Sequence, residues 1–330
     1  KIYMKNSTLF FEDDICTNII KDKTIGIIGY GNQGRAQALN LQDSGVDVIV
    51  GIRDGSKSTD LLKKDKVCFN SIEQVVSKAD ILCMLVPDAK AVEVYNNNVK
   101  PHLSKGKTLL FSHGYNIHYS LINCPEDIDV IMVAPSGGGV MVRSEYKKGS
   151  GVPSLLAVNQ NYSGHALDRA KAYAKLIGSA RICCFLSTFK EETETDLYGE
   201  QVLLTGGIPM IIEKSLKVLL DDGYSPAVAW FVCYYEVKMI VDLFHKNGFE
   251  YLYKAISDTA RYGGLKSGKY LIDDDYENKL KVILDNIKTG KFKKELDKNV
   301  DTLDYRSTID TDSQDEILKL MKVLFKKDNS

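Results

Sequence analysis

The sequence of 330 residues contains 43 basic and 44 acidic residues, and 44% of its residues are hydrophobic. This length suits one large domain or two ordinary ones, and the apolar content excludes disordered and collagen-like classes. A net charge of −1 argues against nucleic acid or an anionic membrane as a partner. Seven irregularly spaced cysteines indicate reduced thiols and a cytoplasmic protein. No apolar run approaches the roughly 18 residues that cross a bilayer, and no signal peptide is expected.

In the first half of the chain, short β-rich runs alternate with helical stretches. The expected strands are Thr24–Ile28, Asp47–Gly51, Ile81–Val86, Thr108–Phe111, Val130–Ala134, Ser154–Val158 and Ala180–Phe185. The helical stretches include Arg35–Leu41, Ile72–Ser77 and Gly164–Ile177. The alternation predicts an α/β Rossmann-like domain, residues 1–185, with a mostly parallel, doubly wound sheet.

The second half has almost no strand signal, and an all-helical domain is expected over residues 186–330. Its expected helices are Glu191–Thr205, Ile208–Asp221, Pro226–Lys246, Phe249–Ala260, Asp274–Thr289 and Ser313–Lys327. Gly206–Gly207, Asn247–Gly248 and Gly263–Gly264 are expected to end helices, because glycine adopts the left-handed conformation that closes a helix.

A glycine motif follows the first expected strand and opens the first expected helix. It reads Gly29, Tyr30, Gly31, Asn32, Gln33 and Gly34, a G-x-G-x-x-G pattern. Such glycines allow a tight turn and let the backbone approach a pyrophosphate at the positive end of a helix. Taken alone, the motif is also compatible with an ordinary glycine-rich turn.

The end of the second expected strand indicates which dinucleotide is bound. Arg53 is followed by Ser56 and Ser58, a guanidinium and two hydroxyls that suit a 2′-phosphate, whereas a carboxylate there favours a bare ribose. NADPH is therefore expected rather than NADH. Asp54 is the residue that disagrees, although it can equally cap the next turn. A loop of the type that covers the nicotinamide follows the next strand, at Val86, Pro87 and Asp88.

Taken together, these motifs and others along the chain resemble the ketol-acid reductoisomerase family, in its short form with a single helical domain. The further matching segments are Leu39–Leu41, Asp43–Gly45, Lys100–Leu103, Ser112–His118, Glu192–Gln201, Val237–Leu243 and Ile256–Ala260. The resemblance implies NADPH and two magnesium ions, which serve to migrate an alkyl group in 2-acetolactate or its ethyl homologue and to reduce the resulting ketone. It also implies a knotted helical domain and an intertwined homodimer whose active site draws on both subunits.

The expected metal ligands are carboxylates. Asp196 and Glu200 lie one helical turn apart, a spacing that reaches a common hard cation but is also typical of a solvated helix face. The resemblance assigns both to magnesium, with Glu236 as a further ligand. A fourth carboxylate of the family is replaced here by Val232, which cannot bind magnesium, so weakened Mg²⁺ binding is expected.

Other departures from the family lie in the expected substrate pocket. Ser136 stands where the family has a lysine and Val140 where it has a histidine, so groups that would orient water or neutralise an alkoxide are missing. Gly139, between them, is expected to contact the cofactor. Ser257 matches the family and is expected at the substrate, whereas the nearby Asp258 and Arg261 depart from it.

Histidine and cysteine are the remaining candidates for catalytic side chains. His113 matches the active-site histidine of the family and is expected to act beside the nicotinamide, although a lone histidine after a strand is often structural. We interpret His118 as structural. Cys233 has no adjacent base in the sequence and is expected to line the pocket as a thiol.

The replacements concentrate in the metal and migration apparatus, whereas the cofactor segments match the family closely. Hydride transfer requires mainly positioning of the reactants, but alkyl migration depends far more on the metal pair. The sequence therefore predicts a divergent NADPH-dependent reductase of a small ketone or imine, with isomerisation weakened or lost. The alternatives are an authentic ketol-acid reductoisomerase and a non-catalytic NADP-binding protein.

Overall fold

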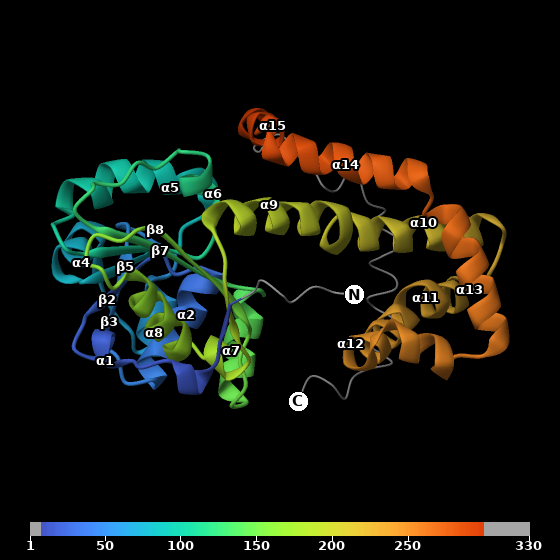
Figure 1. Ribbon diagram of the computed structural model, residues 1–330, viewed down its shortest axis with the longest axis horizontal. Helices are drawn as coiled ribbons and strands as arrows, with labels where there is room; N and C mark the ends of the chain where they lie inside the picture. The colour runs from blue at the N-terminus through green and yellow to red at the C-terminus, as the bar shows by residue number, and fades with distance from the viewer. Residues whose placement is uncertain (1–7, 300–330) are drawn as a thin grey trace. The chain divides into compact units, whose positions relative to one another are not determined.

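The structure is a computed structural model, and it describes residues 8–299. These residues belong to two compact units that divide within one helix, between Thr195 and Asp196. The first unit contains a single nine-stranded sheet with helices on both faces (Figure 1). The predicted Rossmann-like α/β domain is therefore confirmed. The domain boundary expected at residue 185 stays a prediction.

The strands are ordered β1-β9-β8-β7-β6-β5-β2-β3-β4 across the sheet. Their bounds are β1 Leu9–Phe10, β2 Ile25–Ile28, β3 Val48–Ile52, β4 Cys68–Ser71, β5 Ile81–Met84, β6 Thr108–Phe111, β7 Asp129–Pro135, β8 Ser154–Gln160 and β9 Cys184–Leu186. All neighbours from β7 to β4 are parallel, as are β8 and β9. The prediction of a mostly parallel sheet is confirmed.

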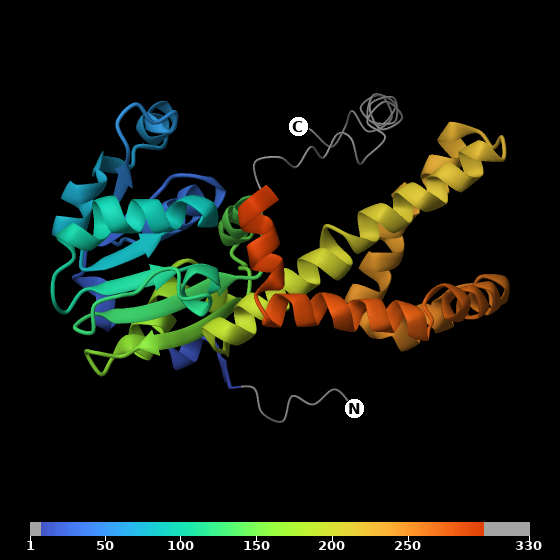
Figure 2. The same ribbon diagram turned by 90° about the horizontal axis from the view of Figure 1, so that it is seen from above.

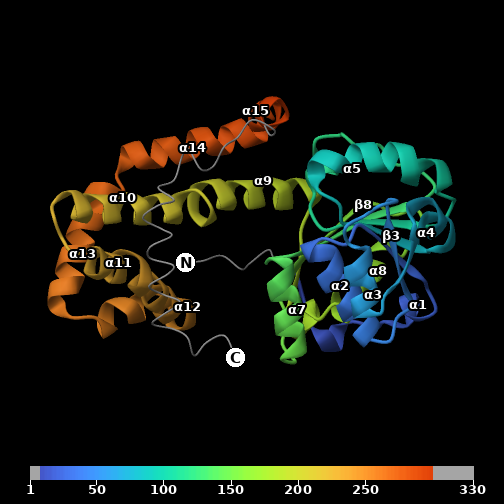
Figure 3. The same cartoon turned by 180° about the vertical axis from the view of Figure 1, so that it is seen from behind.

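Alternate residues of each strand pack on opposite faces of the sheet, as the two-residue period of a strand requires. Ile27 and Ile131 pack with one cluster of buried residues, and their neighbours Ile28 and Val130 pack with another. Helices α2 (Asn32–Asp43) and α8 (Ala166–Leu176) cover the first face, and α4 (Ile72–Lys78) and α5 (Asp88–Val94) the second, as the view from behind also shows (Figure 3).

Four further α-helices belong to this unit: α1 (Asn18–Lys21), α3 (Thr59–Asp65), α6 (Tyr115–His118) and α7 (Gly139–Lys147). Helix α7 explains why β8 runs antiparallel to β7. Its first residue, Gly139, lies so close to Asn32 at the start of α2 that an added Cβ would be 2.1 Å from the Asn32 carbonyl oxygen. The segment between β7 and β8 therefore stays at the end of the sheet where β7 stops. β8 starts at that same end, with Ser154 paired to Pro135, and so runs antiparallel to β7.

Neither edge strand of the sheet was predicted from the sequence. β1 has two residues and β4 ends in Asn70 and Ser71, so neither shows an apolar run. The strand expected at Ala180 begins only at Cys184, because Ser179–Arg181 forms a 3₁₀ turn. Arg181 holds that turn by donating hydrogen bonds to the carbonyl oxygens of Tyr146 and Ser150.

The second unit contains only helices among its described residues (Figure 2). Helix α9 (Phe189–Gly199) enters it, and the others are α10 (Gly207–Asp221), α11 (Pro226–Trp230), α12 (Glu236–Ala255), α13 (Asp258–Leu271), α14 (Asp274–Lys288) and α15 (Lys291–Asn299). Two π-helical segments, Glu200–Leu204 and Phe231–Tyr235, continue α9 and join α11 to α12. The predicted all-helical domain is confirmed; the helix expected at Ser313–Lys327 lies outside the described residues.

The glycine signals had different outcomes. Gly248 has a φ of 80° and interrupts α12, as the sequence predicted. Gly263 and Gly264 instead lie inside α13, so the expected helix end there is wrong. Neither has a positive φ, and a glycine ends a helix only when it leaves the right-handed conformation.

Candidate functional site

The glycine-rich turn forms a cradle at the start of α2. Gly29 has a φ of 98° and donates a 3.0 Å backbone hydrogen bond to the Gly51 carbonyl oxygen. An added Cβ on Gly34 would lie 2.3 Å from the Gly29 carbonyl oxygen, whereas no atom lies within 4 Å of an added Cβ on Gly31. The turn is therefore closely packed at Gly34, and it leaves open space at Gly31. The free amides of the first turn of α2 suit a pyrophosphate in that space.

The residues expected to bind the 2′-phosphate, Arg53, Ser56 and Ser58, lie in the loop between β3 and α3. Ser56 Oγ accepts a hydrogen bond from the Ser58 amide, and Ser58 Oγ donates a long 3.5 Å bond to the Tyr30 carbonyl oxygen. Arg53 and Asp54 are exposed, and neither forms an ion pair within residues 8–299. A guanidinium available beside a serine hydroxyl fits a phosphate dianion.

Gln33 and Asp88 connect loops. Gln33 Nε2 donates a 2.8 Å hydrogen bond to the Gly137 carbonyl oxygen, which fixes the loop after β7 beside the glycine-rich turn. Asp88, at the start of α5, accepts a 3.0 Å bond from Asn116 Nδ2. Pro87 precedes α5 at its N-cap, and Val86 is half-buried. The loop at the carboxyl end of β2 is thus tied to that of β7, and the loop of β5 to that of β6, at the edge where parallel α/β sheets bind ligands.

In the loop after β7, Ser136 is exposed and its amide donates to the Pro153 carbonyl oxygen. Val140, in the first turn of α7, has 76% of its surface exposed. Gly139, between the two in sequence, is buried against the start of α2. This close approach explains the glycine: any side chain here would push α7 away from the cradle.

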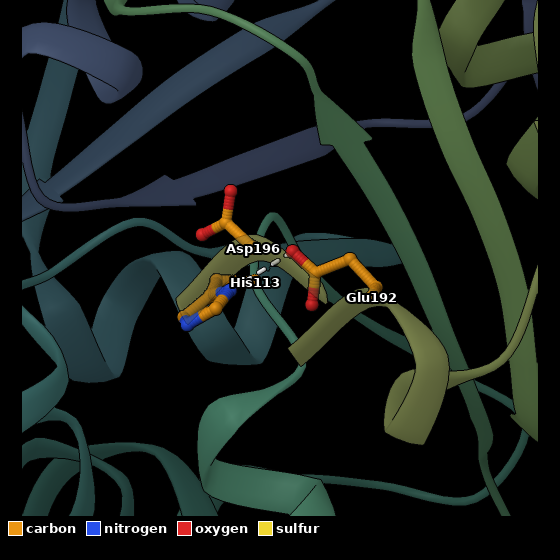
Figure 4. A group of neighbouring side chains, drawn as sticks. All are labelled: His113, Glu192 and Asp196. Carbon is orange, nitrogen blue, oxygen red and sulfur yellow. Dashed lines mark hydrogen bonds and ion pairs between the residues drawn. The ribbon is translucent and has the colours of Figure 1, made fainter. Parts of the chain in front are cut away.

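His113 follows β6 and contacts helix α9. Its Nδ1 lies 2.9 Å from Glu192 Oε1 (Figure 4). The Gly114 amide donates a 2.7 Å hydrogen bond to Glu192 Oε2. Glu192 is only 3% exposed. The contact between His113 Nδ1 and Glu192 fixes the orientation of the imidazole ring.

Asp196, one turn further along α9, completes a cluster of three. Ligand atoms of His113, Glu192 and Asp196 all lie within 4.8 Å of one another, the one such group found among residues 8–299. Both oxygens of Glu192 already accept hydrogen bonds, so we assign Glu192 to orienting His113 rather than to holding a metal. Asp196 is exposed, and its carboxylate has the oxygen donors that magnesium prefers.

Within residues 8–299, the other expected metal ligands do not form a three-residue ligand group with Asp196. Glu200 is exposed at the start of a π-helical segment, and Glu236 is exposed at the start of α12. Neither belongs to a three-residue ligand group within the described part of the chain. The resemblance expects the site to be completed by a second subunit, so this ligand set stays a prediction. The donor chemistry of the carboxylates fits a hard divalent cation.

The remaining expected substrate residues lie in the helical unit. Val232 is 54% exposed and Cys233 is half-buried, both in the π-helical segment before α12. Ser257 caps α13 by accepting a hydrogen bond from the Ala260 amide, and Asp258 pairs with Arg261 in the first turn of that helix. The structure thus gives Ser257 a local structural role, and its expected substrate contact stays a prediction.

Sequence reasoning missed Glu192. The available signal was the recurrence of acids at positions 192, 196 and 200, all on one face of a helix. Only the last two were selected, because the pairing of Glu192 with His113 joins positions 79 residues apart and no local pattern reveals it.

A glycine cradle at a helix start, beside an oriented histidine and a carboxylate, defines a dinucleotide-dependent oxidoreductase. The comparisons with known proteins identify the family. Residues 19–183 match the family model "Acetohydroxy acid isomeroreductase, NADPH-binding domain", and residues 189–324 match "Ketol-acid reductoisomerase, C-terminal domain". The chain belongs to the ketol-acid reductoisomerase family and is an NADP-dependent enzyme of that family.

Similar proteins cover nearly the whole chain. The ketol-acid reductoisomerase (NADP(+)) of Sulfurisphaera tokodaii is 47% identical over 87% of this chain and 86% of its own length. That of Clostridioides difficile is 46% identical over 87% of both chains. The solved structure of an NADH-preferring ketol-acid reductoisomerase from an uncultured archean has a TM-score of 0.86 and 39% identity, and the match covers 89% of this chain and 90% of that one.

No helix within residues 8–299 has the length and apolar character needed to cross a membrane.

Proposed function

We propose that this chain is an authentic NADP-dependent ketol-acid reductoisomerase, which converts 2-acetolactate to 2,3-dihydroxyisovalerate in branched-chain amino-acid biosynthesis. The observation that carries the proposal is the cluster of His113, Glu192 and Asp196 at the end of a dinucleotide-binding sheet. Similarity of about 46% identity to proteins of that name, over most of the chain, supports it.

In this proposal the glycine cradle would hold the pyrophosphate of the cofactor, and Arg53, Ser56 and Ser58 would hold its 2′-phosphate. NADPH supplies the hydride, and magnesium, when bound, polarises the substrate oxygens. Asp196, Glu200 and Glu236 would hold the metal. His113, oriented by Glu192, would hold or move a proton at a substrate oxygen.

The helical unit supplies the argument for a homodimer. Large apolar side chains are exposed on several of its helices, including Val218 at 67%, Tyr262 at 70% and Tyr270 at 83%. Exposed apolar area of this kind is typical of an interface. We propose that a second copy covers it and completes the site with residues such as Glu236. The expected cytoplasmic location stays a prediction.

One specific observation favours a second candidate, the divergent reductase that the sequence predicted. Val232, Ser136 and Val140 stand where the family pattern has charged or polar groups, and two of them are strongly exposed rather than used in packing. The comparisons nevertheless support the authentic activity better than this reading. The non-catalytic alternative has no support, because the chain belongs to a family of enzymes.

The two candidates differ in one measurement. NADPH oxidation is followed with 2-acetolactate plus magnesium, and in parallel with a preformed 2-keto-3-hydroxy acid, which needs no alkyl migration. Comparable kcat/KM for both substrates supports the authentic reductoisomerase. Turnover of the preformed ketone alone overturns it in favour of the divergent reductase.

A variant that restores the family pattern provides the control. On the authentic reading, Val232→Glu combined with Ser136→Lys and Val140→His gives no gain in 2-acetolactate turnover. A gain of about tenfold or more, equivalent to one replaced interaction of ordinary strength, would show that the natural chain lacks migration apparatus.

A further inference from the structure

Asp65, the last residue of α3, receives three hydrogen bonds from the glycine-rich turn and the helix that it opens. The Tyr30 hydroxyl donates to Asp65 Oδ2 at 2.9 Å. Arg35 donates through Nε to Oδ2 at 2.6 Å and through an Nη nitrogen to Oδ1 at 2.9 Å. A bidentate guanidinium fixes the orientation of a carboxylate as well as its distance, so this contact determines where the end of α3 lies.

The contact is shielded from water on the side of α3. The Asp65 side chain is 10% exposed and Tyr30 5%, whereas Arg35 is 44% exposed. The hydrogen bonds from Arg35 lower the pKa of Asp65, and burial raises the pKa of Tyr30 above its usual value. At neutral pH, the carboxylate is therefore charged and the phenol keeps the proton that it donates.

Tyr30 also contacts the opposite end of the same helix. Its carbonyl oxygen accepts the hydrogen bond from Ser58, the residue that precedes α3. Between these two contacts Leu62 is fully buried in the core. Helix α3 is therefore attached at both ends to the second residue of the glycine motif. A seven-residue helix is about 10 Å long, so Asp65 is remote from the loop of Arg53, Ser56 and Ser58 that α3 follows.

We propose that Asp65 is a positioning residue for NADP preference, which holds α3 so that the Arg53–Ser58 loop stays at 2′-phosphate distance from the glycine cradle. The inference rests on the proposed location of the 2′-phosphate. Asp65 does not touch the cofactor. Its loss should therefore weaken recognition of the 2′-phosphate while leaving the part of the cofactor bound by the cradle unaffected.

The test is cofactor binding to the full chain, without substrate or metal. Dissociation constants for NADPH and NADH are measured from nucleotide fluorescence, and that for 2′-AMP by competition. We expect Asp65→Asn to weaken NADPH and 2′-AMP binding about tenfold, the scale of one charged hydrogen bond, and NADH binding by less than twofold. Tyr30→Phe, which removes only the hydroxyl, should shift the same ratio in the same direction by less.

Asp43→Asn is the matched control. It removes a 2.7 Å ion pair that joins α2 to Arg143 of α7 in the same unit, and should leave the ratio of the two constants unchanged. Equal weakening of NADPH and NADH in Asp65→Asn, or no change in either, overturns the inference. If Asp65→Asn does not fold, an unchanged ratio in Tyr30→Phe overturns it.

Two results separate this inference from the proposed function. Arg53→Ala should lose the preference for NADPH if the 2′-phosphate binds at Arg53 at all. If it does not, the proposed cofactor site fails. If Arg53→Ala loses the preference and Asp65→Asn keeps it, only the role of Asp65 fails.

Discussion

The two units of this chain bury their apolar side chains to very different extents. The sheet unit packs large clusters on both faces of its strands, and every residue of β2, β5 and β6 is buried, as are all residues of β7 except Pro135. In the helical unit, the cluster described is small, formed by Leu216, Ala229 and Trp230, while apolar side chains elsewhere are exposed. The first unit therefore obtains its hydrophobic stabilisation from its own chain, and the second is suited to obtaining much of it from a partner.

The functional consequence follows from helix α9, which carries residues of both units. Glu192 is buried and bonded to His113 of the sheet unit, whereas Asp196, one turn later, is exposed. On the proposed function, Glu192 belongs to the proton chemistry and Asp196 to the metal site. Neither Glu200 nor Glu236 joins Asp196 in a three-residue ligand group within residues 8–299.

The largest expected effect tests this division at Asp196. Replacing it with asparagine keeps the size of the side chain and removes the charge, so magnesium-dependent turnover of 2-acetolactate should fall by about a thousandfold, a few kcal/mol of lost metal stabilisation. NADPH affinity should not change. The control is Glu191→Gln on the same helix, where the carboxylate is exposed and bonded to Ser187. Full activity in Asp196→Asn would remove Asp196 from the metal site.

A second prediction concerns the exposed apolar surface. Tyr270 and Leu271 are 83% and 66% exposed at the end of α13, and a double change to aspartate should halve the mass measured by light scattering and abolish turnover. Phe11→Asp is the control, because Phe11 is an exposed apolar residue of the sheet unit. An unchanged mass in the double variant, or a monomeric natural protein, would contradict the homodimer.

A third prediction sharpens the description of the sheet unit as tightly packed. Gly139→Ala places a Cβ 2.1 Å from the Asn32 carbonyl oxygen, so α7 must move away from α2 at an expected cost of about 3 kcal/mol in the free energy of unfolding. NADPH affinity should fall as well, since Asn32 begins the helix of the cradle. Gly138→Ala is a closely matched control, because no atom lies within 4 Å of its added Cβ. Equal unfolding free energies for the two variants would show that α7 is mobile there.

The sequence predicted the buried strands of the sheet unit better than the helices of the helical unit. The reason is again the burial of apolar side chains within one chain. Strands such as Thr108–Phe111 were predicted at their exact bounds, because buried parallel strands appear as continuous apolar runs between turn residues. The edge strands escaped because their contacts are made with distant segments rather than encoded in a local pattern. In the helical unit, periodicity predicted α10 and α14 closely. It did not predict the break in helical type at Phe231–Tyr235, nor the helices Asp258–Leu271 and Lys291–Asn299.

The site shows the same limit. The glycine cradle is local in sequence, so its position and the glycine at residue 29 were predictable. Glu192 was not, because its importance comes from the pairing with His113 across two elements. Gly139 was selected as a cofactor contact, whereas the structure shows a packing reason for it, the close approach to Asn32.

The smallest predicted effect is a pH dependence confined to the sheet unit. His118 lies 3.5 Å from Glu194, and burial lowers its pKa below the usual value although Glu194 opposes the shift. A lowered folded-state pKa means that the unfolded chain takes up a proton first as the pH falls. Stability should therefore be fully present above the ordinary histidine pKa of about 6.5 and decrease as the pH falls below it. Unfolding of the whole chain is followed by circular dichroism. Fluorescence of Trp230, the single tryptophan, reports separately on the helical unit, in which it is buried. His118→Gln should flatten the decrease, and His245→Gln, at an exposed helical-unit position, should not. A decrease that persists unchanged in His118→Gln would assign it to other groups.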